Sequence, residues 1–294
     1  MIVTMFIFAV QDGISSHLAE RYNTITVVMI RYWAFAGFVL LYSLFRYKSI
    51  SKVAKTKKPF LQIARSVILV LEIITTVIAF VRLGLVQSHA IFACFPLIAT
   101  ALSVPILHET VGWRRWTAVG IGFLGVLIIL RPDGNIAVWD ALIPLFSAGL
   151  FALYHVLTRL ASRSDAPETS FFWTGIAGAV SISCIGPFFW NPMIGDDWYW
   201  MGALCVTSIV GHFLLIIALT LSEASKLQPF TYFQLLFAGL IGVMVFSETI
   251  TPSTITGGLL ILSAGLFAMM RQPNQPEAPI RAQRAKPGSR ETWE

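Results

Sequence analysis

Charged residues are scarce in this chain: only 12% of its 294 residues are Asp, Glu, Lys or Arg, while 56% are apolar. A soluble domain carries about twice that share of charge. Segments that alternate apolar and polar residues, as the strands of a membrane barrel do, are also missing. The apolar residues instead form runs of about 20, long enough for a helix to cross a membrane. The composition therefore predicts an all-α membrane protein.

Cysteines are few, and the common catalytic motifs are absent from the sequence. Cys94, Cys184 and Cys205 lie singly in apolar segments, which indicates neither a disulfide framework nor a metal cluster. No Walker motif, nucleophile elbow or HExxH sequence occurs. Gly120–Gly125 matches GxGxxG but lies inside an apolar segment, where small residues favour close helix packing over dinucleotide binding. The sequence thus predicts no cofactor and no metal, and it argues against a membrane-embedded enzyme.

Ten apolar segments are expected to form transmembrane helices. They are placed at residues 2–19, 25–45, 61–82, 87–107, 114–131, 139–160, 169–190, 199–221, 226–246 and 253–270. Residues 271–294 are polar and lack apolar periodicity, which predicts a disordered tail. Pro96, inside the fourth segment, predicts a bend there because proline cannot donate a helical hydrogen bond.

The distribution of Lys and Arg predicts the orientation of these helices. Sixteen of the 21 basic residues fall at one end of the predicted bundle: Arg46, Lys48, Lys52, Lys55, Lys57, Lys58, Arg114, Arg115, Arg159, Arg163, Lys226, Arg271, Arg281, Arg284, Lys286 and Arg290. Only Arg21, Arg82 and Arg131 fall at the other end. Cytoplasmic loops carry the excess of Lys and Arg, so both termini are expected in the cytoplasm. The net charge of +6 is thereby explained without a nucleic-acid partner.

The two halves of the chain resemble each other. Phe8–Asp12 and Phe151–His155 both read Phe-Ala-aliphatic followed by two polar residues. Glu109 and Glu248 each end a predicted helix and are each followed by an apolar, glycine-bearing helix. Because each half holds five predicted helices, an odd number, the second half must enter the membrane with the opposite orientation. Inverted repeats of this kind occur in secondary transporters, whose solute sites lie near the membrane midplane.

Together with Arg31 early in the second helix, these features resemble the EamA branch of the drug/metabolite transporter superfamily over residues 1–270. The resemblance implies a first five-helix repeat at 1–134, a second at 135–270 and a cytoplasmic tail at 271–294. Within that branch, the chain looks most like bacterial riboflavin importers of the inner membrane, with riboflavin as solute. S-adenosylmethionine carriers and proton-coupled exporters of amino acids remain as alternatives, and a homodimer is left open. A non-transporting scaffold is the other class considered.

Ionisable and polar side chains inside predicted membrane helices are costly, which makes them candidates for a solute site. The alternative explanation for each of them is structural: the side chain would form hydrogen bonds between packed helices. The polar candidates are Gln11, Asp12, Glu72, Tyr154, His155, His212 and Gln234. Aromatic candidates that offer flat apolar faces to a planar solute are Phe92, Phe95, Trp173 and Tyr232.

Several other polar residues are expected to have structural roles. Arg31 is placed near the outer interface, and His17 and His89 are placed near helix ends. Glu109 and Glu248 are expected to accept hydrogen bonds from backbone N–H groups at the start of the next helix.

Overall fold

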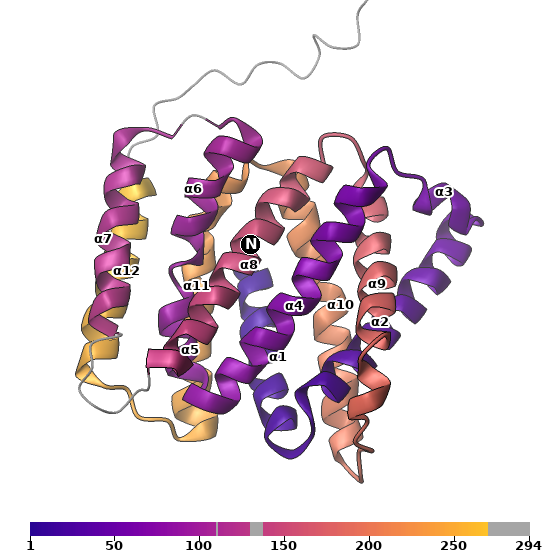
Figure 1. Cartoon of the computed structure of the whole chain (residues 1–294), viewed down its shortest axis with the longest axis horizontal. Coiled ribbons are helices and arrows are strands. Elements are labelled where there is room, and N and C mark those ends of the chain that lie inside the picture. The colour runs from indigo at the N-terminus through magenta and orange to yellow at the C-terminus, as the bar shows by residue number, and fades with distance from the viewer. Residues whose placement is uncertain (110, 130–137, 270–294) are drawn as a thin grey trace, which may run out of the picture.

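The computed structural model describes residues 1–109, 111–129 and 138–269, and every regular element in these ranges is helical. Figure 1 shows the helices as a bundle. The elements are α1 (Ile2–Arg21), α2 (Thr24–Tyr47), α3 (Ile50–Ala54), α4 (Pro59–Leu83), α5 (Leu85–Phe92), α6 (Phe95–Leu107), α7 (Trp113–Ile129), α8 (Val138–Ala161), α9 (Pro167–Ser183), η1 (Gly186–Phe189), α10 (Asp197–Leu221), α11 (Ala224–Phe246) and α12 (Pro252–Met269). The tail predicted at 271–294 lies outside the described residues.

Six helical segments are long and apolar enough to cross a membrane. They are Ile2–Arg21, Thr24–Tyr47, Pro59–Leu83, Leu85–Leu107, Trp139–Ala161 and Asp197–Leu221. Shorter apolar stretches lie in α7, α11 and α12, and α9 has 17 residues. Large apolar side chains such as Phe60, Trp139 and Met244 are exposed on the surface, where lipid would cover them. The structure thus supports the predicted helical membrane class, while the number of ten spans stays a prediction.

The helix expected at 87–107 is broken. α5 ends at Phe92 and α6 begins at Phe95, directly before Pro96. The proline occupies the first turn of α6, where its missing N–H has no helical partner to lose. The helix expected at 169–190 is also shorter than predicted, because it ends at Ser183 and the chain continues into η1.

Most helices pack against helices of the other half of the chain. α1 lies against α10 and α11, and α8 lies in the corresponding way against α4 and α6. α2 pairs with α9, and α7 pairs with α12 along one edge of the bundle (Figure 1). The counterparts in the two halves are α1 and α8, α2 and α9, α4 and α10, α5 with α6 and α11, and α7 and α12. Exchanging each helix for its counterpart gives the same set of pairs. The two halves are therefore interleaved in the way that a two-fold relation between repeats requires.

The two glutamates that mark the sequence repeat follow turns of the same geometry. His108 and Ser247, the residues before them, have φ of 56° and 54°. The backbone N–H of Glu109 donates to Ser103 O at 3.3 Å, and that of Glu248 donates to Gly242 O at 3.1 Å. Each bond reaches back six residues, so α6 and α11 end in the same way.

The sequence predicted that Glu248 binds the start of the next helix, but the structure shows a different partner. Its two carboxylate oxygens accept hydrogen bonds from the backbone N–H groups of Leu85 and Val86, each at 2.7 Å. These groups open α5, a helix of the other half that packs against α11. The expectation was wrong about the partner because adjacency in space, not in sequence, decides which free N–H groups a carboxylate reaches. A negative charge is stabilised at a helix N-terminus.

Candidate functional site

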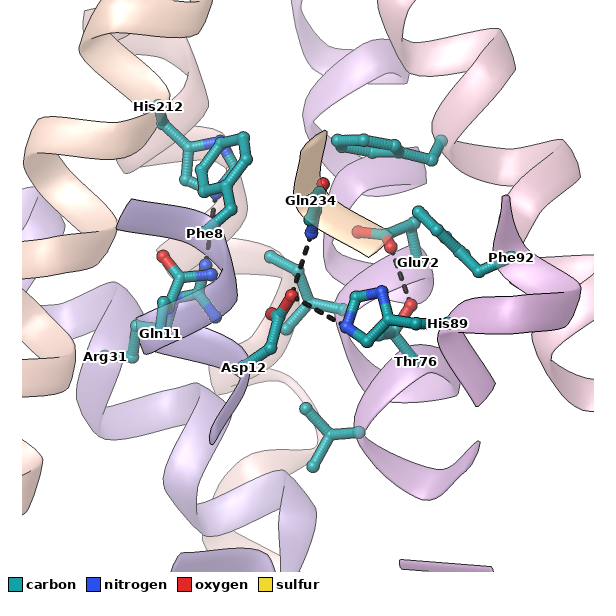
Figure 2. A pocket seen from close by; sticks show the side chains of 13 residues that line it. Phe8, Gln11, Asp12, Arg31, Glu72, Thr76, His89, Phe92, His212 and Gln234 are labelled. Atoms are coloured by element: carbon teal, nitrogen blue, oxygen red, sulfur yellow. Dashed lines mark hydrogen bonds and ion pairs between the residues drawn. The ribbon is translucent and has the colours of Figure 1, made fainter. Parts of the chain in front are cut away.

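A central cavity lies where four helical elements of the first half meet three of the second. All the space between its lining side chains, including the open mouth, amounts to about 420 Å³. Asp12 and Glu72 lie near the midpoints of α1 and α4, so the cavity sits midway along the bundle. The lining residues are Phe8, Gln11, Asp12, Arg31, Glu72, Ile73, Thr76, Val77, His89, Phe92, Phe151, His212 and Gln234. In Figure 2, Arg31 and His212 occupy one side, and Glu72, Thr76 and His89 occupy the other.

Asp12 joins the two halves inside this cavity. Its Oδ2 accepts a hydrogen bond from Gln234 Nε2 of α11 at 2.8 Å. His89 Nε2 lies 3.2 Å from the same oxygen, which makes an ion pair when the imidazole is protonated. His89 was expected near a helix end, but it is buried in the cavity wall because α5 is a short helix enclosed by α1, α4, α8 and α11.

Glu72 is a second buried carboxylate, and it is held by hydroxyl groups. Thr76 Oγ1 donates to its Oε1 at 2.7 Å, and Ser147 Oγ of α8 lies 3.3 Å from the same atom. Among the described residues, no Lys, Arg or His nitrogen lies within 4 Å of its carboxylate. Within the described ranges, Glu72 therefore places a carboxylate with no basic group in ion-pair range on the cavity wall.

Arg31 provides the opposite charge. It was expected near the outer interface, but it is only 3% exposed and lines the cavity. Its Nε donates to Ser208 Oγ at 2.6 Å, and its Nη2 lies 3.1 Å from His212 Nε2. The position was misjudged because burial against α10 depends on how α2 packs, which the sequence does not reveal. In the described part of the chain, no carboxylate lies within ion-pair distance of this guanidinium.

A two-repeat helical bundle with a charged central cavity agrees with the family that the sequence matches. The EamA-like transporter family matches residues 1–131 and 138–270. The chain belongs to this family. The resemblance inferred from the repeat and its glutamates is thereby confirmed.

Named relatives of this EamA-like protein are transporters. It is 28% identical over 254 residues to a riboflavin transporter of Rhizobium johnstonii, covering 84% of this chain and 82% of the relative. It is 25% identical over 260 residues to an S-adenosylmethionine uptake transporter of Rickettsia bellii, covering 87% of each. It is 23% identical over 272 residues to a pseudopaline exporter of Pseudomonas aeruginosa, covering 90% and 92%. The chain is a membrane transporter and not an enzyme.

The fold has also been seen in solved structures. One crystal structure superposes with a TM-score of 0.66 and covers 90% of this chain and 95% of its own. The two sequences are 15% identical, so the likeness concerns the fold alone.

The structure brings about half of the predicted site residues of this EamA-like transporter together. Those that line the central cavity are Gln11, Asp12, Glu72, Phe92, His212 and Gln234. Phe95 and Tyr232 line a small neighbouring pocket, which shares Phe92, His89 and Gln234 with the first. The two cavities are therefore adjacent, separated by side chains that belong to both.

The other predicted residues lie outside both cavity walls. His155 is fully buried behind Phe151, with its ring centroid 4.4 Å from that of the phenyl ring. Tyr154 is fully buried under the guanidinium of Arg65, 5.8 Å from its ring centroid. Trp173 donates from Nε1 to Ala54 O of α3 at 3.0 Å, at the end of the bundle.

The sequence also contained a signal for two cavity residues that were not selected. Phe8 and Phe151 open the matching Phe-Ala segments of the two halves. In the structure their rings approach each other, with centroids 6.5 Å apart, and both line the cavity. The phenylalanines of the repeat, and not only the polar residues that follow them, thus meet between the halves. For Thr76 and His89 no pattern in the sequence pointed to the cavity.

Proposed function

We propose that this EamA-like protein is a secondary transporter of the inner membrane that moves a small metabolite by alternating access. Ten spans would form two inverted five-helix repeats, with both termini in the cytoplasm. The observation that carries the proposal is the central cavity, where buried charged residues of the first half, Asp12, Arg31 and Glu72, face His212 and Gln234 of the second half midway along the helices. A solute bound there would be exposed first to one side and then to the other as the halves rock.

The orientation is supported by where the loops lie. The basic loop that contains α3 is at the upper end of Figure 1, together with the connection between α8 and α9. The segment around η1, which includes Asp196 and lacks Lys and Arg, lies at the lower end. The excess of positive charge at the upper end favours the cytoplasm for that end.

Riboflavin is the first candidate solute. The rings of Phe8, Phe92 and Phe151 offer apolar faces to a planar molecule, and Gln11 and Gln234 offer amide groups beside them. Pockets for small molecules combine apolar walls with a few polar groups in this way. Tyr154 and His155 would form a second layer behind Phe151. The similarity to a riboflavin transporter agrees with this assignment.

S-adenosylmethionine is the second candidate, favoured by the separation of charge in the cavity. Arg31 has neutral hydrogen-bond partners, and so has Glu72, on opposite sides of the cavity. A solute that carries both a carboxylate and a cationic group could pair with both of them. Such pairs are stronger than neutral hydrogen bonds in a low-dielectric site. An amino-acid solute would satisfy the same two charges, so it belongs to this second class.

Binding to the purified protein separates the two classes. Quenching of flavin fluorescence measures riboflavin binding, and radiolabelled S-adenosylmethionine measures the second candidate, each with the other as competitor. Glu72→Gln should weaken S-adenosylmethionine about tenfold or more, since it removes a charge pair, and should affect riboflavin far less. Glu20→Gln, an exposed glutamate of α1, is the matched control. If neither compound binds or enters proteoliposomes, both assignments of solute are wrong.

A further inference from the structure

Arg65 of α4 is a second buried cation, lying between the central cavity and the basic end of the bundle. It has no exposed surface. Its Nε donates to Gln62 Oε1 at 2.6 Å, its Nη1 to Thr158 Oγ1 at 3.2 Å and its Nη2 to Thr174 Oγ1 at 2.9 Å. Nη2 also donates to the carbonyl oxygen of Ser170. All of these acceptors are neutral, which is an expensive environment for a buried charge unless every donor is satisfied.

The partners of Arg65 beyond α4 all belong to the second half of the chain. Thr158 lies near the end of α8, and Ser170 and Thr174 lie in the first turns of α9. Neighbouring residues reinforce the same contact. Gln62 Nε2 donates to Asp165 Oδ2 at 2.8 Å and to Ser170 Oγ at 3.1 Å. The basic end of α4 is therefore fastened to α8 and α9 by a network centred on one guanidinium.

We propose that Arg65 is the latch that closes the solute pathway at the basic end of the molecule. This inference rests on the alternating access proposed above. Opening that end requires α4 to separate from α8 and α9, because they belong to different halves. The guanidinium would then exchange its protein acceptors for water, which solvates a cation well. The guanidinium is thus stable when the protein satisfies all its donors or when water does. A half-open position of α4, in which some donors have neither, is disfavoured.

The opposite end of the bundle is closed by weaker means. There Asp197 of α10 accepts from Tyr22 Oη at 2.8 Å and from Arg21 Nη1 at 3.3 Å. The side chain of Arg21 is 59% exposed, so water screens this pair. α4 and α10 each have 25 residues, and counting from their first residues places Ala203 where α4 has Arg65. Among the described residues, α10 thus has no buried arginine at the position that corresponds to Arg65, and the basic end is the more firmly closed of the two.

Accessibility of the cavity to a thiol reagent tests the latch directly. The three native cysteines are replaced, and Val77→Cys places a reporter in the cavity wall. A membrane-impermeant methanethiosulfonate is added to vesicles whose basic end faces the medium, as shown by cleavage at a protease site inserted between Lys48 and Ser49, in the loop between α2 and α3. Without solute, the reagent should label the reporter cysteine in the Arg65→Met protein roughly tenfold faster or more than in the protein that keeps Arg65. Tenfold is the factor that one or two hydrogen bonds to a charged group represent.

Arg82→Met is the matched control, because Arg82 lies on the same helix at the other end, with a side chain 63% exposed. It should leave labelling from the basic end unchanged. If Arg65→Met does not insert, Thr174→Val decides: it removes one acceptor of the second half, and faster labelling supports the latch. Unchanged labelling in an inserted variant overturns it. Labelling needs no solute, so a wild type that transports nothing would contradict the proposed function and leave the latch standing.

Discussion

Gln234 donates from Nε2 to Asp12 Oδ2 across 2.8 Å, and this bond joins residues that are 222 positions apart. One residue lies on α11 of the second half, and the other lies on α1 of the first. Because the acceptor is ionisable and the donor is not, the strength of the bond depends on the charge of Asp12. The same carboxylate lies beside His89 of α5, so a change at Asp12 alters contacts among α1, α5 and α11.

Asp12→Ala should reduce solute transport about tenfold or more. The substitution leaves Gln234 Nε2 without its acceptor, and an unsatisfied buried group costs about 1–3 kcal/mol. It also removes the carboxylate that lies beside His89. Uptake into proteoliposomes with equal amounts of inserted protein measures the effect. Asp196→Ala, at an exposed position outside the helices, should transport normally. Normal transport by both variants would remove Asp12 from the site.

Asp12→Asn, which keeps the shape of the side chain, tests whether the charge of Asp12 is needed for proton coupling. Loss of the pH dependence of transport with solute binding retained would indicate that it is.

Glu248→Gln should destabilise the fold by about 2 kcal/mol, because two hydrogen bonds from the N-terminus of α5 lose a charged acceptor. Solute affinity should also fall, since α5 carries His89 and Phe92 into the cavity. Thermal unfolding in detergent and ligand binding provide the two measurements. The exposed Glu20→Gln serves as the comparison. Equal melting points for the two variants would mean that the carboxylate does not hold α5 in place.

Gly84→Ala should destabilise the protein by about 1–3 kcal/mol, the cost of a side chain in a backbone region that glycine alone adopts freely. Gly84 has φ of 80° and ψ of 170° immediately before α5. A Cβ added there would lie 3.1 Å from the carboxylate of Glu248, so it would also disturb the bonds that open the helix. Gly37→Ala, on α2 with open space around it, should be neutral or slightly stabilising. The difference in melting temperature between these two variants is the measurement, and a difference near zero would contradict the prediction.

Asp165→Asn should reveal a stability contribution that depends on pH. Asp165 connects α8 to α9. Burial raises its pKa, but hydrogen bonds from Thr56, Gln62 and the Lys57 N–H, with the charge of Arg65, outweigh burial and lower it below the ordinary value. A lowered pKa gives stability that is present above the unfolded pKa of about 3.9 and is lost as pH falls through the folded value.

We therefore expect Asp165→Asn to melt below the wild type at pH 7. The difference should persist down to about pH 5 and shrink below about pH 4, where the wild-type carboxylate takes up its proton. Asp196→Asn, at the exposed position near the opposite end, should match the wild type at pH 7. A difference that grows as the pH falls would contradict the sign of this prediction.

The sequence was informative where local pattern and solvent preference act alone. Apolar runs interrupted by loops predicted the helices, and Pro96 marked the break between α5 and α6. The repeated Glu109 and Glu248 predicted two halves, whose helix ends proved to have the same geometry. Asp12 and Glu72 stood out because placing a carboxylate within an apolar membrane helix costs free energy, which makes such a residue a candidate for function.

Tertiary structure alone decided which of these groups meet. His89 and Arg31 were expected near the ends of helices, yet both line the cavity, since the break in the helix and the packing of α2 on α10 bring them inward. Glu248 binds α5, 162 residues away, and not the helix that follows it. Arg65 drew no functional prediction, although it is the centre of the network that fastens α4 to α9. Helix formation and membrane preference depend on a window of some twenty residues, whereas partners across the halves depend on how the two repeats interleave, and no local window of the sequence holds that information.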